Sequence, residues 1–211
     1  MKKTTGLWII LIAGILGFAW VTWGVVSGSA QPFDNALINA FVDARQPGLS
    51  TLMEGITYLG NWEAIVIICL LLLLKEDRAK KYGWPAAAAA VITTLVRIVI
   101  KDIVQRPRPD RSLFLIDQNG WSFPSGHAIT SIAVYGLLFI LFMLYMKKGA
   151  RKTVICALCA VLAFAIGISR IYLAVHYPSD VLGGWLLGIS TIAGMLLLID
   201  FVKKKFASRK L

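Results

Sequence analysis

Residues 124–148 read PSGHAITSIAVYGLLFILFMLYMKK. After a polar start, the run from His127 to Met146 contains no Asp, Glu, Lys or Arg, and two lysines follow it. About 20 apolar residues in a helix cross a hydrocarbon core that is about 30 Å thick. Inside a membrane such a segment must satisfy its own backbone hydrogen bonds, which a helix does. The stretch therefore predicts a membrane-spanning helix with a polar cluster at one surface and basic residues at the other.

The whole chain has the composition of a membrane protein. Of its 211 residues, 58% are hydrophobic and 16% are charged, and the mean hydropathy is +0.74. These values argue against a soluble globular domain, an acidic disordered chain and a disulfide scaffold. We expect an all-α fold, with residues 1–211 forming one bundle of six transmembrane helices. The predicted spans are Leu7–Val26, Ile56–Leu74, Trp84–Val104, His127–Met146, Val154–Tyr172 and Asp180–Val202.

Basic residues indicate how the bundle is oriented. Most of the 22 Lys and Arg residues fall in segments that a six-span chain places on one side. These segments contain Lys2 and Lys3; Lys75, Arg78, Lys80 and Lys81; Lys147, Lys148, Arg151 and Lys152; and Lys203, Lys204, Lys205, Arg209 and Lys210. The positive-inside rule assigns this side, and both termini, to the cytoplasm. The net charge of +11 is then a topology signal and an affinity for anionic lipid, and no nucleic-acid partner is expected.

Two features near the N-terminus complete the predicted architecture. The apolar run in Leu7–Val26 is longer than the core of a signal peptide, so we expect an uncleaved first span. Phe33–Gln46 has apolar residues at helical spacing and predicts a short amphipathic helix on the outer leaflet. Three cysteines, Cys69, Cys156 and Cys159, fall inside spans, where we interpret them as small core residues.

Three polar segments lie at the outer ends of the predicted spans: residues 101–109, 124–127 and 169–180. Charges at membrane depth cost about 2.5–3.5 kcal/mol each on insertion scales, so they need an explanation. Taken singly, a basic side chain here could extend to the interface, and Ser125 could simply cap a helix. Together the segments place several cations, both histidines and a helix N-terminus at one membrane surface, which indicates a functional site.

These groups suit phosphoryl transfer. A phosphoryl group in transfer spreads negative charge over three oxygens, so fixed cations stabilise it. Lys101, Arg108 and Arg170 supply such charges, and arginines bind phosphate through two donors. Ser125 and Gly126 open the fourth span, where free backbone N–H groups form an anion site. Because Gly126 has no side chain, a ligand can approach the backbone closely there. No metal ion or other cofactor is expected, since there is no Cys/His/carboxylate cluster of ligand spacing.

The two histidines fit two separate roles. Asp180 lies four residues after His176, across a turn, and can orient the imidazole and stabilise its charged form. His176 can then attack phosphorus as a neutral nucleophile. His127 remains as the general acid for the leaving oxygen and later as the base for water.

The three segments resemble the signature motifs of the type-2 phosphatidic acid phosphatase (lipid phosphate phosphatase) superfamily, which also includes vanadium haloperoxidases. The motifs are Lys-x6-Arg-Pro, Pro-Ser-Gly-His and Ser-Arg-x5-His-x3-Asp. The matching residues are Lys101, Arg108, Pro109, Pro124, Ser125, Gly126, His127, Ser169, Arg170, His176 and Asp180. With their supporting helices they cover about residues 95–190. The six spans are similar to the bacterial membrane branch, with its phosphatidylglycerophosphatases and undecaprenyl-pyrophosphate phosphatases.

The resemblance implies a metal-independent hydrolase that forms a phosphohistidine at His176, with phosphate contacts from Lys101, Arg108, Ser125, Gly126 and Arg170. The expected substrates are lipid phosphates of the bilayer: phosphatidylglycerophosphate, phosphatidic acid or undecaprenyl pyrophosphate. We expect the lipid tails to enter between spans three and five. The site would face the extracytoplasmic side of a bacterial plasma or inner membrane.

Alternative functions stay open at this point. A transporter or channel for anionic lipid or phosphate would also place cations at membrane depth. However, it has no need of the His176–Asp180 pair beside His127, and the halves show no broken-helix repeat. An inactive lipid-binding relative would not keep the nucleophile and the acid. A phosphotransferase with another acceptor than water would use the same site, and the oligomeric state is left undetermined.

Two further arginines lie in or near the first motif. Arg97 lies one helical turn before Lys101, and we expect it to tie spans together by pairing with Glu54 or Glu63, with a contact to the substrate as the alternative. Arg106 is interpreted as a solvated loop charge or as a contact for anionic headgroups.

Overall fold

The computed structural model describes residues 2–207; Arg209 and Lys210 of the predicted basic tail lie outside this range. Every regular element in this range is helical, which confirms the all-α fold. The α-helices are α1 (Lys2–Val26), α2 (Gln31–Asp43), α3 (Pro47–Tyr58), α4 (Trp62–Leu73), α5 (Glu76–Arg78), α6 (Trp84–Val104), α7 (Gly126–Ser131), α8 (Leu137–Tyr145), α9 (Ala150–Tyr172) and α10 (Pro178–Ala207). Ala79–Gly83 and Ile132–Gly136 are π-helical, and Arg111–Leu113 is one turn of 3₁₀ helix.

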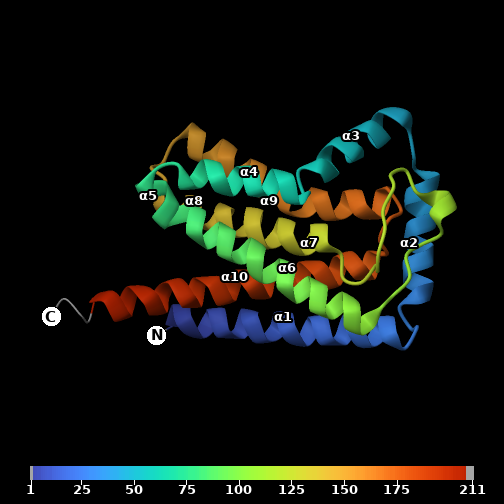
Figure 1. Cartoon of the computed structure of the whole chain (residues 1–211), viewed down its shortest axis with the longest axis horizontal. Coiled ribbons are helices and arrows are strands. Elements are labelled where there is room, and N and C mark those ends of the chain that lie inside the picture. The colour runs from blue at the N-terminus through green and yellow to red at the C-terminus, as the bar shows by residue number, and fades with distance from the viewer. Residues whose placement is uncertain (1, 208–211) are drawn as a thin grey trace.

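The long helices lie side by side and form a bundle with two different ends (Figure 1). Both ends of the described chain, α5 and the α8–α9 connection gather at one end. The opposite end holds α2, the loop from α6 to α7 and the α9–α10 connection. The predicted basic segments therefore lie at the end away from the three polar segments.

Length and hydropathy suit four helical segments of the described chain for crossing a membrane: Thr4–Val26, Gly126–Tyr145, Ala150–Tyr172 and Pro178–Lys205. The pair α3 and α4 could supply a fifth if its two bent helices form one span. Helix α6, which carries Arg97, Lys101 and Asp102, is not in this set. The chain is thus a multi-pass membrane protein by these criteria.

The predicted second span, Ile56–Leu74, is not a continuous helix. It breaks between α3 and α4, which meet at an angle of 52°, and α4 with 12 residues is only about 18 Å long. The break occurs at Gly60–Asn61, where a Cβ on Gly60 would lie 2.4 Å from Ile166 and 2.8 Å from His127. Glycine therefore lets the break pack directly against α7 and α9.

The centre of the bundle is the α7–α8 unit, in which Ala133, Leu137 and Leu141 are almost fully buried. At the edge, α1 packs along α10 and exposes large apolar side chains such as Trp20. The two helices approach closely because Gly14 leaves room for Ser190; a Cβ there would lie 2.2 Å from the serine hydroxyl. The cysteines Cys69, Cys156 and Cys159 are buried, as predicted.

The predicted amphipathic helix is present as α2, which runs across the end of the bundle (Figure 1). Its two most buried side chains are Asp34 and Ile38, while Phe33 is exposed. Ile38 packs with Ala128, Ile171 and Val181 from three bundle helices. This packing fixes α2 over the connections that carry the polar segments.

Candidate functional site

The three polar segments meet at the end of the bundle that α2 covers. Lys101 is near the end of α6, Arg108 is in the following loop, and Ser125, Gly126 and His127 open α7. Arg170 lies in the last turn of α9, His176 in the next connection and Asp180 in the first turn of α10. Direct contacts join them: Arg108 Nη1 lies 3.2 Å from His176 Nε2, and the Ser125 N–H donates to the Asp180 carbonyl at 3.1 Å.

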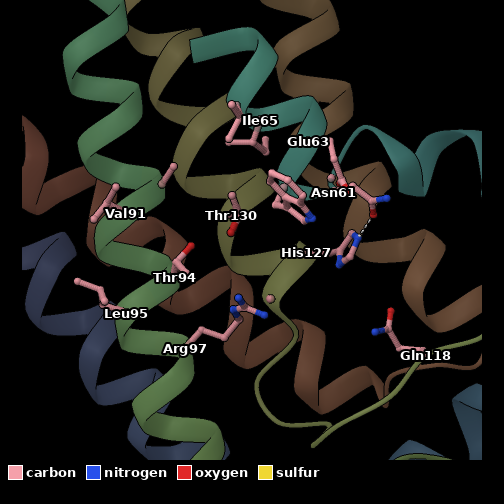
Figure 2. Close-up of a pocket in the computed structure, with 15 residues that line it drawn as sticks. Asn61, Glu63, Ile65, Val91, Thr94, Leu95, Arg97, Gln118, His127 and Thr130 are labelled. Carbon is pink, nitrogen blue, oxygen red and sulfur yellow. Dashed lines mark hydrogen bonds between the residues drawn. The ribbon is translucent and has the colours of Figure 1, made fainter. Parts of the chain in front are cut away.

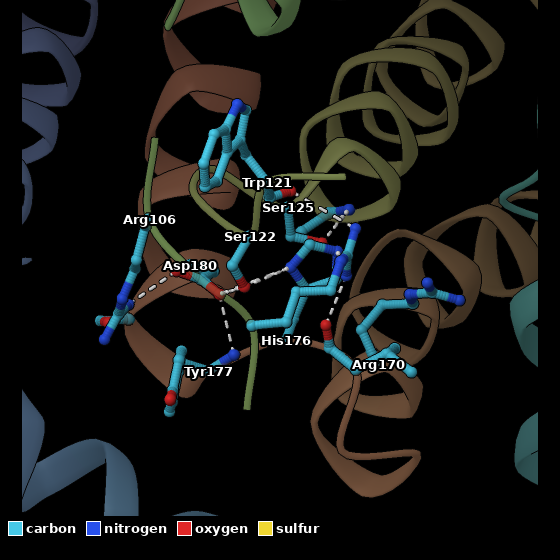
Figure 3. A network of polar contacts seen from close by, with 12 residues as sticks. Arg106, Trp121, Ser122, Ser125, Arg170, His176, Tyr177 and Asp180 are labelled. Atoms are coloured by element: carbon cyan, nitrogen blue, oxygen red, sulfur yellow. Dashed lines mark hydrogen bonds and ion pairs between the residues drawn. The ribbon is translucent and has the colours of Figure 1, made fainter. Parts of the chain in front are cut away.

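His176 and Asp180 form the buried pair that the sequence predicts (Figure 3). The distance from His176 Nδ1 to Asp180 Oδ2 is 3.4 Å. The Tyr177 backbone N–H donates to the same carboxylate oxygen at 2.8 Å, and the Ser122 hydroxyl donates to it as well. Because Arg108 can only donate, its contact with Nε2 indicates that the ring hydrogen is on Nδ1, toward Asp180.

The environment of His176 keeps its imidazole neutral. The side chain is almost completely buried, and burial together with the Arg108 and Lys101 charges lowers the pKa of His176 well below 6.5. A neutral ring with its hydrogen on Nδ1 has a lone pair on Nε2, which faces Arg108. The geometry thus suits a nucleophilic nitrogen placed beside a cation.

Arg106 is buried and paired with two carboxylates. The interpretation of Arg106 as a solvated loop charge or a contact for anionic headgroups is therefore wrong. Its side chain is 8% exposed and bridges two buried carboxylates: Nη1 lies 2.7 Å from Asp180 Oδ1, and Nη2 lies 2.6 Å from Asp34 Oδ2. Although burial opposes the charge, these carboxylates raise the pKa of Arg106 above its ordinary value. Asp34 also accepts hydrogen bonds from the N–H and hydroxyl of Ser179, at 2.8 and 2.6 Å.

The candidate phosphate-binding cations are held by neutral groups. Lys101 donates to the carbonyl oxygens of Trp121 and Ser122, the latter at 3.1 Å. Burial and the Arg111 charge lower the pKa of Arg108 to about 10, against the opposing effect of Asp180, so the guanidinium stays charged near neutral pH.

Arg170 is the most buried of these cations, at 1% exposure. It donates to the hydroxyl of Thr57 at 2.8 Å and to the side chain of Gln118. Its Nε is buried and has no hydrogen-bond partner within residues 2–207. An unpaired buried donor costs free energy, so this N–H is available for an anion.

The N-terminus of α7 offers further donors. Ser125 caps the helix: its hydroxyl accepts from the Ala128 N–H, which leaves the hydroxyl hydrogen free to donate. In the described part of the chain, the backbone N–H groups of Gly126 and His127 have no acceptor. No group of three or more His, Cys, Asp or Glu side chains within residues 2–207 could hold a metal ion.

His127 lies on another side of the site, at a cavity of about 580 Å³ (Figure 2). Its Nε2 is 2.8 Å from Asn61 Oδ1, at the break between α3 and α4. The cavity extends from His127 along apolar side chains of α4 and α6, among them Val66 and Leu95, which are partly exposed. Its lining thus comes mainly from α4, α6 and the start of α7.

Arg97 also lines this cavity, and the predicted ion pair with Glu54 or Glu63 is wrong. Within residues 2–207 it forms no ion pair with Glu54 or Glu63. Instead its side chain crosses Gly126: a Cβ on Gly126 would lie 2.5 Å from Arg97 Cδ and 3.1 Å from Nη1. The absence of a Cβ at residue 126 thus makes room for Arg97.

The part of the sequence that contains the three polar segments shows which protein family the chain belongs to. Residues 82–204 match the PAP2 superfamily, and this range includes all three polar segments. The chain belongs to the PAP2 superfamily. The resemblance seen in the motifs is thereby confirmed.

Individual PAP2 proteins are similar over most of the chain. Phosphatidylglycerophosphatase B of Bacillus subtilis is 30% identical over 82% of this chain and 87% of its own length. Decaprenylphosphoryl-5-phosphoribose phosphatase of Mycobacterium tuberculosis is 31% identical over 72% of this chain and 81% of its own. The crystal structure of a transmembrane PAP2-type phosphatidylglycerolphosphate phosphatase from Bacillus subtilis superimposes with a TM-score of 0.77, at 30% identity, covering 92% of this chain and 96% of that one.

These relationships identify the chain as a membrane lipid phosphatase, a hydrolase. Several residues around the PAP2 site were not found from the sequence. Asp34 and Asn61 lie outside the matched range 82–204 and carry no motif. The only signals were an acidic residue on the predicted amphipathic helix and a Gly-Asn pair inside an otherwise apolar span. Ser122 gave no signal.

Proposed function

We propose that this PAP2 protein hydrolyses lipid phosphates at the extracytoplasmic face of a bacterial plasma or inner membrane through a phosphohistidine on His176. The observation that carries the proposal is the chain of contacts from Arg108 to His176 Nε2, at 3.2 Å, and from His176 Nδ1 to Asp180, at 3.4 Å. It supports a neutral nucleophile that is oriented by a carboxylate and lies beside a phosphate-binding cation.

In the first step, the lone pair of His176 Nε2 attacks phosphorus while the bond from phosphorus to the lipid oxygen breaks. His127 gives a proton to that oxygen, and Asp180 stabilises the positive charge that develops on His176. In the second step, His127 removes a proton from water, the water oxygen attacks phosphorus, and the P–N bond breaks. Phosphate is released and His176 regains its lone pair.

The remaining groups would bind the transferred phosphoryl group. Lys101, Arg108 and Arg170 provide positive charge, and the unpaired Arg170 Nε suits a phosphoryl oxygen. Ser125, Gly126 and the N-terminus of α7 add a hydroxyl and free N–H groups. Fixed donors of this kind stabilise charge as it develops, without reorganisation.

We further propose one domain with six spans and both termini in the cytoplasm. The segregation of the basic segments to one end of the bundle, away from the site, supports this orientation (Figure 1). Helix α6 would be the third span, and the pair α3–α4 would be a broken second span. Its gap beside α6 would admit lipid tails to the cavity while the headgroup reaches His127.

The test is phosphate release by the detergent-solubilised protein in EDTA, on phosphatidylglycerophosphate, phosphatidic acid and undecaprenyl pyrophosphate. Wild type is compared with His176→Ala and His127→Ala, each verified as folded by size-exclusion chromatography. We expect either substitution to lower turnover by about a hundredfold or more, as loss of a nucleophile or general acid does. Full activity in His176→Ala, or a requirement for added metal ion, would overturn the mechanism.

A further inference from the structure

Arg97 differs from the other cations near the site because it has no polar partner. Arg45, Lys101, Arg106, Arg108, Arg111 and Arg170 each donate at least one hydrogen bond. Within residues 2–207, Arg97 forms neither a hydrogen bond nor an ion pair, although it is only partly exposed. A cation half-buried among apolar helices is unfavourable unless an anion pairs with it.

The position of Arg97 is set by packing. Its side chain passes over Gly126, so that Nε and Nη1 would both lie 3.1 Å from a Cβ built there. Figure 2 shows Arg97 reaching from α6 toward the start of α7, on the same side as His127. Its guanidinium therefore lies next to the proposed phosphate site, on the wall of the cavity.

This cavity borders the proposed general acid, His127, and not the proposed nucleophile, His176. Its lining includes Arg97, Gly126 and His127, whereas His176 and Arg108 are not part of it. In an in-line displacement, the leaving oxygen departs on the side of phosphorus opposite to the nucleophile. The group attached to that oxygen, which carries the lipid, must then occupy the cavity beside Arg97.

We propose that Arg97 binds a second phosphate group, one carried by the leaving portion of the substrate. This inference rests on the proposed function and names its substrate class: lipids with two phosphates in the headgroup. A lipid diphosphate has its second phosphate directly on the leaving oxygen, and phosphatidylglycerophosphate has it one glycerol further along. Phosphatidic acid has none, so Arg97 favours the first two classes over the third.

With a lipid diphosphate, the lone pair of His176 Nε2 forms the P–N bond while the bond from the outer phosphorus to the bridging oxygen breaks. The electron pair goes to that oxygen, which becomes part of the lipid monophosphate and develops negative charge as the bond breaks, until it takes the proton from His127. Arg97 is placed to stabilise this charge, so its contribution grows in the transition state and affects kcat. With phosphatidylglycerophosphate, the second phosphate keeps a constant charge, so Arg97 affects mainly KM.

The test compares Arg97→Gln and Arg97→Lys with wild type on undecaprenyl pyrophosphate, phosphatidylglycerophosphate and phosphatidic acid. Arg78→Gln, an exposed arginine at the opposite end of the bundle, is the matched charge control. We expect Arg97→Gln to lower kcat/KM by about tenfold or more on the two-phosphate lipids and by less than about threefold on phosphatidic acid, since a charge-assisted contact is lost only with the former. Arg97→Lys should recover part of the loss, and Arg78→Gln should match wild type on every substrate.

The two kinds of two-phosphate lipid are distinguished by which constant Arg97→Gln changes: mainly kcat with undecaprenyl pyrophosphate, and mainly KM with phosphatidylglycerophosphate. An equal loss on all three lipids, or no loss on any, would overturn the inference while leaving the phosphohistidine mechanism intact. If His176→Ala keeps wild-type activity, the proposed function fails and the inference fails with it.

Discussion

Arg106 Nη1 lies 2.7 Å from Asp180 Oδ1, so the carboxylate that faces His176 is itself held by a buried arginine (Figure 3). The same guanidinium lies 2.6 Å from Asp34 on α2, and its carbon lies 4.1 Å from the centre of the Tyr177 ring. Two carboxylates and one arginine thus form a buried network that connects an N-terminal helix to the phosphatase motifs. Buried networks of this kind are costly to break at a single member.

The first prediction concerns coupling within this network. Asp34→Asn and Arg106→Gln should each destabilise the protein by about 3 kcal/mol. The first removes one of the two carboxylates that pair with Arg106, and the second leaves the buried Asp34 and Asp180 without their arginine. Both should also lower kcat, since Asp180 is less firmly oriented. The double variant should be less destabilised than the sum of the two single variants by at least about 0.5 kcal/mol. Thermal unfolding in detergent measures this; strict additivity would mean that the two residues act independently.

The second prediction concerns pH. Burial and the Arg108 charge lower the pKa of His176 well below 6.5, so the folded protein keeps this imidazole neutral when the pH falls just below 6.5. In the unfolded chain the imidazole takes up a proton at a pH of about 6.5. The contribution of neutral His176 to the free energy of unfolding is therefore complete above that pH and is lost as the pH falls below it. The Tm of wild type should therefore fall more steeply with acidification than that of His176→Gln. Parallel curves would show that the folded state protonates His176 normally.

The third prediction concerns Asn61, whose Oδ1 accepts a hydrogen bond from His127 Nε2 at 2.8 Å. Asn61→Ala should lower kcat by about tenfold, because the proposed general acid loses the contact that orients its ring. In a His127→Ala background the same change should have almost no effect on turnover, since no ring remains to be oriented. Measuring kcat for the four proteins distinguishes this role from a general defect, which would lower turnover equally in both backgrounds.

The fourth prediction concerns the six-span orientation. The three native cysteines are buried, so a membrane-impermeant thiol reagent should react poorly with them. In intact cells, the reagent should label Asp117→Cys, in the exposed loop before α7, and spare Lys148→Cys, in the α8–α9 connection. Permeabilised cells should show labelling of both variants. The reverse pattern in intact cells would place the site in the cytoplasm.

The sequence alone determined the all-α character of the chain, the predicted helices apart from the broken second span, and the identity of the motif residues. These features depend on local sequence: apolar runs predict helices that cross the hydrocarbon core of a membrane, and the spacing of the motif residues can be read from the sequence. Even the amphipathic helix α2 could be predicted from its periodicity.

Only the tertiary structure decided how the polar residues pair. Arg106 meets Asp34 where α2 covers the loop after α6, Asn61 meets His127 at a helix break, and Arg97 lines the cavity instead of meeting an acidic partner. These pairings join residues far apart in the chain, so they depend on helix packing and on where a glycine leaves room. Periodicity shows which face of a helix is apolar, but it contains no information about which side chains meet across an interface.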